Sequence, residues 1–201
     1  MFTVISQQTF DEIQVDAGVL LKEFDPLNPA APDDEDIIAA TTGGISISCV
    51  PQYSDFGEDI DNCPNNTMEL KHLDGWECTV STTAIGTSPN AIRLALGAAD
   101  ITGDKITPRR TLKLTDFGEL WWVGDKANGG MVAVKIFNAL STGGITLQTT
   151  KNGKGQVSLE LGAHVSLYDQ DTIPMEFYST APDDEGGTTG GTTGGTTSGT
   201  T

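Results

Sequence analysis

The sequence has 201 residues, a net charge of −17 and an apolar fraction of 37%, which suits one globular domain followed by a polar segment. Residues 1–70 carry 14 acids against one base, Lys22, whereas residues 71–180 are nearly balanced, with 11 acids and 10 bases. A charge this negative argues against a protein that grips phosphates or an anionic membrane surface, because such proteins offer Lys and Arg.

No targeting segment is visible at the start of the chain. Residues 1–10 contain no basic residue and no apolar core of the length that an export signal needs. The longest apolar runs of the sequence are also far shorter than a membrane span. We therefore expect a protein that is neither exported nor bound to a membrane.

Two acidic segments interrupt the first third of the chain. Residues 25–36 contain three prolines, and both segments are expected to be long surface loops, which in a compact domain usually bind something or lack order. The second segment, residues 55–66, half-matches a calcium loop but has no glycine where such a loop tightens. A solvated or interface loop is therefore favoured over a metal site. The acids are Asp33, Asp34, Glu35 and Asp36 in the first segment and Asp55, Glu58, Asp59 and Asp61 in the second.

Alternation of apolar and polar residues predicts strands on both sides of the second acidic segment. One strand starts at Ile45, after a turn at Gly43-Gly44. Residues 68–73 and a strand from Trp76 onward are expected to form a hairpin across Asp74-Gly75, because glycine tolerates the positive φ of a tight turn.

One short helix is well signalled after these strands. Ser88 is suited to cap its start, and Pro89 to occupy its first position, where the missing N–H costs nothing. Residues 90–99 are expected to be helical, and Gly97 can end the helix.

Alternation returns after the helix, in residues 132–136, 145–149 and 156–161. Gly129-Gly130 is interpreted as a turn between strands, and residues 151–155 as a hairpin connection. Strands, one helix and more strands favour an antiparallel β-sandwich or curled sheet with one flanking helix over a parallel α/β fold. The domain is expected to span residues 1–180, and residues 181–201 to form a flexible Gly/Thr-rich tail with nothing apolar to bury.

Three cysteines, Cys49, Cys63 and Cys78, leave one unpaired in any disulfide scheme, which suits a reducing compartment. Free buried thiols are favoured, with a Cys49–Cys63 bridge as the alternative.

No group of residues points to catalysis, a metal or a cofactor. His72 and His164 are interpreted as ordinary strand residues, because neither has a Cys or carboxylate at ligand spacing. The known phosphate-binding and nucleophile motifs are missing from the sequence. Adjacent Trp121 and Trp122 on a strand would point to opposite faces, so one is expected in the core and the other under a neighbouring subunit.

Several segments together resemble one family. Residues 16–21 (DAGVLL), 24–26 (FDP) and 41–45 (TTGGI) resemble the opening of the major tail proteins of tailed bacteriophages. Residues 55–61, the stretch from 68 to 82, and residues 92–100, which end in LGAAD, are similar to the same group. The resemblance covers about residues 10–178.

The resemblance implies a tail tube protein of the virion, assembled in the cytoplasm of the bacterial host together with other tail proteins. In that family, β-sandwiches with a flanking helix join strands into homo-hexameric rings whose inner wall is a continuous β-barrel. The rings stack into a tube through which the genome passes. A negative bore would repel DNA phosphates, so that DNA passes without specific binding.

The polar faces of the paired strands are the candidates for lining the lumen, and both acidic loops are the candidates for contacts between subunits or rings. The apolar face, with Trp76, Cys78, Val80, Val157, Leu159 and Leu161, should then form the core. The lumen candidates are Glu69, Lys71, Glu77, Thr79, Ser81, Ser158 and Glu160.

A cell-surface or carbohydrate-binding β-sandwich module on a flexible tether is the alternative. The missing export signal and the odd number of cysteines argue against it.

Overall fold

The computed structural model describes residues 5–149, 151 and 153–181. The chain is mostly β, as the sequence predicts. The predicted Gly/Thr tail lies outside the described residues apart from Ala181. In chain order the elements are α1 (Gln7–Asp11), β1 (Gln14–Leu21), β2 (Ile37–Asp55), the 3-10 helix η1 (Met68–Leu70), β3 (Lys71–Ile85), α2 (Pro89–Leu96), β4 (Ala99–Thr102), β5 (Lys105–Pro108), the 3-10 helix η2 (Leu114–Asp116), β6 (Gly118–Lys126), β7 (Met131–Ser141), β8 (Leu147–Gln148), β9 (Gln156–Gly162) and β10 (Met175–Ser179).

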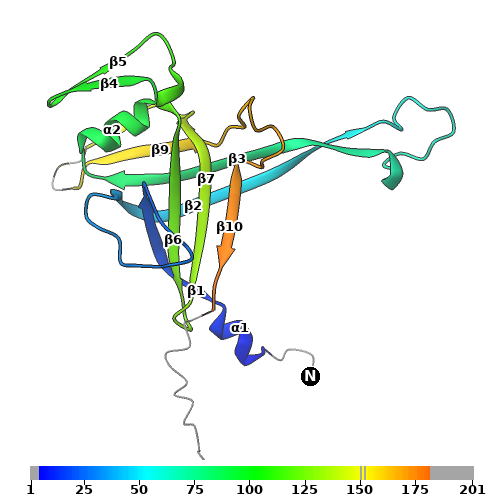
Figure 1. Ribbon diagram of the computed structural model, residues 1–201, viewed down its shortest axis with the longest axis horizontal. Coiled ribbons are helices and arrows are strands. Elements are labelled where there is room, and N and C mark those ends of the chain that lie inside the picture. Colours follow the sequence, from blue (N-terminus) through cyan, green and yellow to red (C-terminus); the bar gives the residue numbers. More distant parts are fainter. Residues whose placement is uncertain (1–4, 150, 152, 182–201) are drawn as a thin grey trace, which may run out of the picture.

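One antiparallel sheet of eight strands, in the order β10-β7-β6-β1-β2-β3-β9-β8, forms the body of the molecule (Figure 1). The sheet curls until the end of β7 also pairs with β9, at Leu140↔Gly162 and Ser141↔Leu161. The pairings therefore close into a ring through β7, β6, β1, β2, β3 and β9. β7 changes direction at Asn138, whose φ is 47° and whose side-chain amide donates to the His164 carbonyl at 2.9 Å. The fold is a sandwich closed along one corner, with the small β4–β5 hairpin outside it.

The predicted core face is confirmed. Cys78, Val80, Val157, Leu159 and Leu161 are all buried, and Trp76 is partly buried against the same cluster. Burying every second residue of β3 and β9 removes apolar area from water and fixes the register, because a slip of one residue would exchange the two faces.

The flanking helix α2 is also confirmed, but it ends earlier than predicted. The Ser88 hydroxyl accepts from the Ala91 N–H at 3.2 Å, and Gly97 at φ 70° follows the last turn. The prediction that Ala99 is helical is wrong, since this residue begins β4, which pairs with β5. The positive φ at Gly97 stops the helix at that point.

Two predicted turns are wrong, because the chain passes through them as bulged strand. At Gly43-Gly44 the pairing of β2 with β3 shifts between Thr42 and Ile45. At Asp74-Gly75 it shifts again, and Gly75 lacks the positive φ of a tight turn. An extra residue in one strand can be absorbed as a bulge, so the same residues that make good turns here bend a continuous hairpin. The later turn is as predicted, with Gly129 at φ 84° between β6 and β7.

The prediction for the tryptophan pair is half wrong. Trp122 lies in the main core and Trp121 on the other face, as alternation requires. However, Trp121 is also buried, at 6% exposure, because its own chain covers it. Phe24 and Tyr178 place their ring centres at 5.8 Å and 5.6 Å from the Trp121 ring. No neighbouring subunit is needed to cover it.

Candidate functional site

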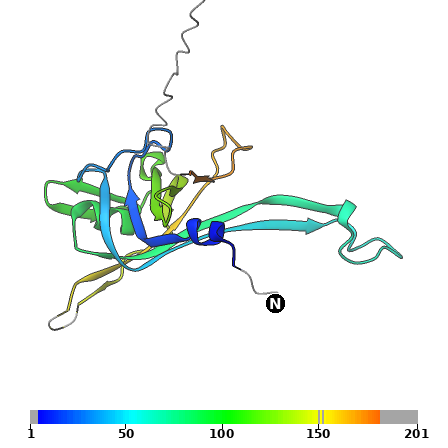
Figure 2. The same ribbon diagram turned by 90° about the horizontal axis from the view of Figure 1, so that it is seen from below.

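The β2–β3 hairpin extends far beyond the body, as Figures 1 and 2 show. β2 pairs with β1 only at Ile37 and Ala39, and β3 pairs with β9 only over Thr79–Ile85. We call residues 50–77 the arm: a two-stranded ribbon and its tip, which pair only with each other among the described strands. A lone hairpin is marginally stable in water, so a ribbon of this kind is suited to a contact with another molecule.

The sheet β2-β3-β9 has one polar face on the outside of the sandwich. Cross-strand pairs place Ser46 beside Ser81 and Ser81 beside Glu160, and they place Thr83 beside Ser158. The face offers hydroxyls and two carboxylates and no cation. We call this set the polar face: Ser46, Ser48, Glu77, Thr79, Ser81, Thr83, Ser158 and Glu160.

The structure brings five of the predicted lumen candidates together on the polar face: Glu77, Thr79, Ser81, Ser158 and Glu160. Lys71 lies on the opposite face, because the bulge at Asp74 exchanges the two faces of β3 beyond it. Glu69 lies in η1 at the tip of the arm. Ser46 and Ser48 were missed, although their alternation with Ile45 and Ile47 is the signal that finds them.

One edge of this sheet is open. The Cys78 carbonyl accepts from the Ala163 N–H at 2.9 Å and so points away from β2. The pair Cys49↔Cys78 therefore exchanges no backbone hydrogen bonds, and the N–H and carbonyl of Cys49 face outward. Beyond Ala39, the outer edge of β2 meets no described strand. Pro51, which has no N–H to donate, is in a position that only an edge strand tolerates.

The cysteines pair differently from either prediction. Cys49 and Cys78 lie directly opposite each other on β2 and β3 and form a disulfide, while Cys63 in the arm tip is a free thiol. Three free thiols and a Cys49–Cys63 bridge are both wrong. The long hairpin register, which local sequence did not reveal, is what brings Cys78 opposite Cys49.

The second acidic segment forms the tip of the arm, and its acids have different roles. The Asp55 carboxylate accepts from the backbone N–H groups of Gly57 at 2.9 Å and Asn66 at 3.1 Å, which closes the tip loop. Glu58, Asp59 and Asp61 are exposed. Phe56, Ile60 and Met68 are exposed too, at 64%, 52% and 79%. The tip is therefore an ordered loop with carboxylates and apolar side chains in water.

The first acidic segment lies elsewhere, between β1 and β2. Its start is a capped turn, in which Asp25 accepts from the side chain of Asn28 and the N–H of Leu27, both at 2.9 Å. These bonds, that of Asn28 foremost, lower the pKa of Asp25. The acids at 33–35 are exposed. A hollow of about 760 Å³ lies between this loop and the β6–β7 turn. The structure thus does not bring the two acidic loops together.

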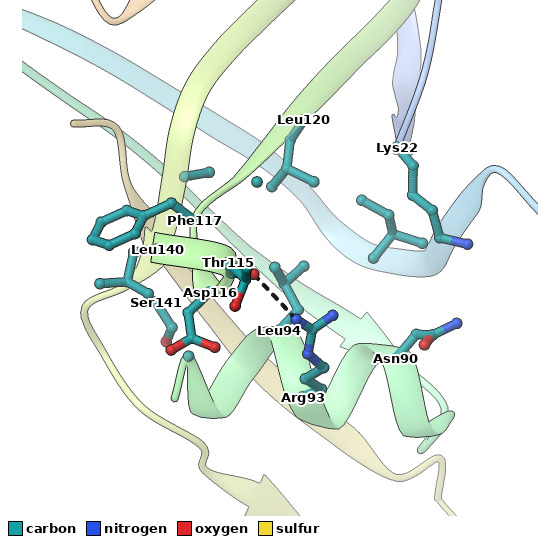
Figure 3. Close-up of a pocket in the computed structure, with 14 residues that line it drawn as sticks. Lys22, Asn90, Arg93, Leu94, Thr115, Asp116, Phe117, Leu120, Leu140 and Ser141 are labelled. Atoms are coloured by element: carbon teal, nitrogen blue, oxygen red, sulfur yellow. Dashed lines mark hydrogen bonds between the residues drawn. The ribbon is translucent and has the colours of Figure 1, made fainter. Parts of the chain in front are cut away.

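A smaller pocket of about 170 Å³ opens where α2 meets the body (Figure 3). Lys22 at the end of β1 and Arg93 on α2 stand at its rim. Asp116 on η2 also lines it, with a side chain only 1% exposed. The Lys113 N–H, at 2.8 Å, and the Arg109 guanidinium both donate to this carboxylate and, in that order, hold its pKa below the ordinary value of 3.8. Sequence reasoning missed this pocket, since five separated segments build it.

Within residues 5–149, 151 and 153–181, no group of three or more His, Cys, Asp or Glu could hold a metal ion. His72 packs against Phe56 on the arm, with ring centres 5.7 Å apart, and the His164 ring lies edge-on to Phe117 at 5.3 Å. In the same part of the chain, no helix is long and apolar enough to cross a membrane.

Comparison with known proteins gives a likeness in structure, and none in sequence families or curated relatives. Neither the protein-family models nor the curated proteins match this chain. Among solved structures, the chain is similar to a chain of the virion of a native gene transfer agent (GTA) particle, with 13% identity and a TM-score of 0.41. The likeness covers 82% of this chain and 96% of that chain. At this level of similarity it carries no functional argument, and what the chain does has to be inferred from its own surfaces.

Proposed function

We propose that the chain is a structural virion protein of a phage-like particle that assembles with copies of itself into stacked rings, forming a tail tube. The open edge of β2 carries this proposal. An edge with outward backbone groups on a long, exposed strand is a template for pairing with another chain. The other end of the sheet β2-β3-β9-β8 is also an edge, because β8 is its last strand and has only two residues. A neighbour's β2 can therefore add beside it.

Closing such sheets into a ring would cover the open edges of β2 and β8, as closure does in any β-barrel. In this arrangement the polar face lines the bore. The carboxylates of Glu77 and Glu160 would repel the phosphates of passing DNA, and the hydroxyls of this face carry no positive charge that would hold them. The net charge of the whole chain, −17, has the same effect. Homo-hexameric rings follow from the family resemblance.

Both acidic loops then take part in contacts between copies. The tip of the arm extends beyond the body and exposes Phe56, Ile60 and Met68, which solvent disfavours. Burying such side chains against a neighbour would stabilise the assembly by about 25 cal/mol for each Å² of apolar area. The loop at residues 25–36 would contact a neighbour at another point of the surface.

Size-exclusion chromatography with negative-stain microscopy of the purified chain tests the proposal. Rings or tubes are the expected result. A stable monomer at all concentrations would reject it and favour the tethered surface or carbohydrate-binding module.

A further inference from the structure

The pocket beside α2 presents two cations, Lys22 and Arg93, that form no salt bridge with a carboxylate among the described residues. The Lys22 amine donates to the Glu35 backbone carbonyl, and the Arg93 guanidinium to the Thr115 carbonyl at 3.5 Å (Figure 3). The carboxylate in the pocket, Asp116, is already paired with Arg109. The rim is therefore a place of unpaired positive charge in a chain with a net charge of −17.

The floor of the same pocket is apolar. Ile38, Leu120 and Ala139 line it and are at most 7% exposed, and Leu94 of α2 forms one wall. A cavity of about 150 Å³ can hold a benzene-sized group, so a pocket of about 170 Å³ has room for one apolar side chain. The ligand that suits this site is an apolar side chain flanked by carboxylates.

The tip of the arm carries that combination. Ile60 is 52% exposed and lies between Asp59 and Asp61, in an arm that holds seven acids against one base, Lys71. Two backbone hydrogen bonds fix the turn. The Ile60 N–H donates to the Gly57 carbonyl at 3.2 Å, and the Cys63 N–H donates to the Ile60 carbonyl at 3.1 Å. A loop that is ordered before binding loses less conformational entropy when it binds.

The pocket and the tip lie at opposite ends of the molecule. In both views the arm leaves the body on one side, and α2 with the β4–β5 hairpin lies on the other (Figures 1 and 2). The tip of one chain therefore points away from its own pocket and can reach such a pocket only on a second copy. A contact between two different surfaces repeats from copy to copy, giving a closed ring or an open filament.

We propose that the arm tip of one copy docks in the α2 pocket of another, with Ile60 on the apolar floor and Asp59 and Asp61 facing Arg93 and Lys22. This contact rests on the proposed function, in that it names the partner surface through which copies join. All four charged side chains are exposed, so the attraction weakens as salt is added.

Charge reversal on each surface tests the contact. The pocket variant is Lys22→Glu with Arg93→Glu, the tip variant is Asp59→Lys with Asp61→Lys, and a fourth chain combines all four changes. Lys105→Glu with Asp171→Lys is the control, matched to the combined variant in leaving the net charge unchanged, since both side chains are exposed and outside the two surfaces. Sedimentation velocity measures association, circular dichroism checks folding, and neutral Gln and Asn replacements substitute for any reversal that does not fold.

The pocket and tip variants are expected to associate at least about tenfold more weakly than the wild type. The combined variant should regain association, and the control should be unchanged. Undiminished association of either single-surface variant, no recovery in the combined variant, an equal loss in the control, or a wild type that stays monomeric would each overturn the contact.

Microscopy of the same samples distinguishes this contact from the tube. Rings that form equally well in all variants would leave the tube standing and reject the contact. Open oligomers that dissociate on charge reversal, without rings, would support the contact and reject the tube.

Discussion

Truncating Leu159 tests the assignment of the two faces of β9. Leu159 is 1% exposed and packs with Ala84, Val157 and Ala95, so it joins the sheet to α2. Leu159→Ala leaves a cavity where these elements meet, which costs about 2–5 kcal/mol of unfolding free energy. Its neighbour Ser158 lies on the polar face and is exposed, so Ser158→Ala should change stability by less than about 0.5 kcal/mol.

Thermal unfolding of unassembled subunits, followed by circular dichroism, measures both variants. For a chain of this size each kcal/mol lowers the melting temperature by about 2–4 °C, so a loss of about 3 kcal/mol corresponds to about 6–12 °C. Ser158→Ala serves as the matched control, one residue away on the same strand. Equal losses in the two variants, or a larger loss at Ser158, would refute the register on which the polar face depends.

Three further predictions concern the pocket, the cysteines and the tail. Asp116→Asn should destabilise the subunit by about 1–3 kcal/mol at neutral pH. Because the folded-state pKa of Asp116 is lowered, the difference in stability between the variant and the wild type should fade as the pH falls through that pKa. Melting measured as a function of pH tests this, and a difference that stays constant would contradict it. Thiol titration of the unreduced, denatured chain should find one free thiol, Cys63, and three would show that Cys49 and Cys78 are unpaired. Truncation after Glu185 should leave assembly intact, since residues 186–201 have no apolar side chain to bury; loss of rings would make the tail a structural arm.

Features set by neighbouring residues could be predicted from the sequence. The start of α2 follows from Ser88 and Pro89, whose capping chemistry is local. The buried face of β9 follows from strict alternation at Val157, Leu159 and Leu161. The same alternation found most of the polar face.

Features set by distant residues could not be predicted from the sequence. Gly43-Gly44 and Asp74-Gly75 have the chemistry of tight turns, and only pairing along the whole hairpin makes them bulges. That pairing also decides the disulfide and places Lys71 on the opposite face. The α2 pocket collects side chains from Lys22 to Ser141, so nothing in local sequence could reveal it.

Electron cryomicroscopy of the assembled chain, at a resolution that shows side chains, tests the central proposal most directly. The expected map is a tube of stacked rings, with the polar face of β3 and β9 lining the bore and β2 pairing with the next subunit along its open edge. A tube whose bore is lined by another surface, with Thr79, Ser81 and Glu160 on the outside, would contradict the account.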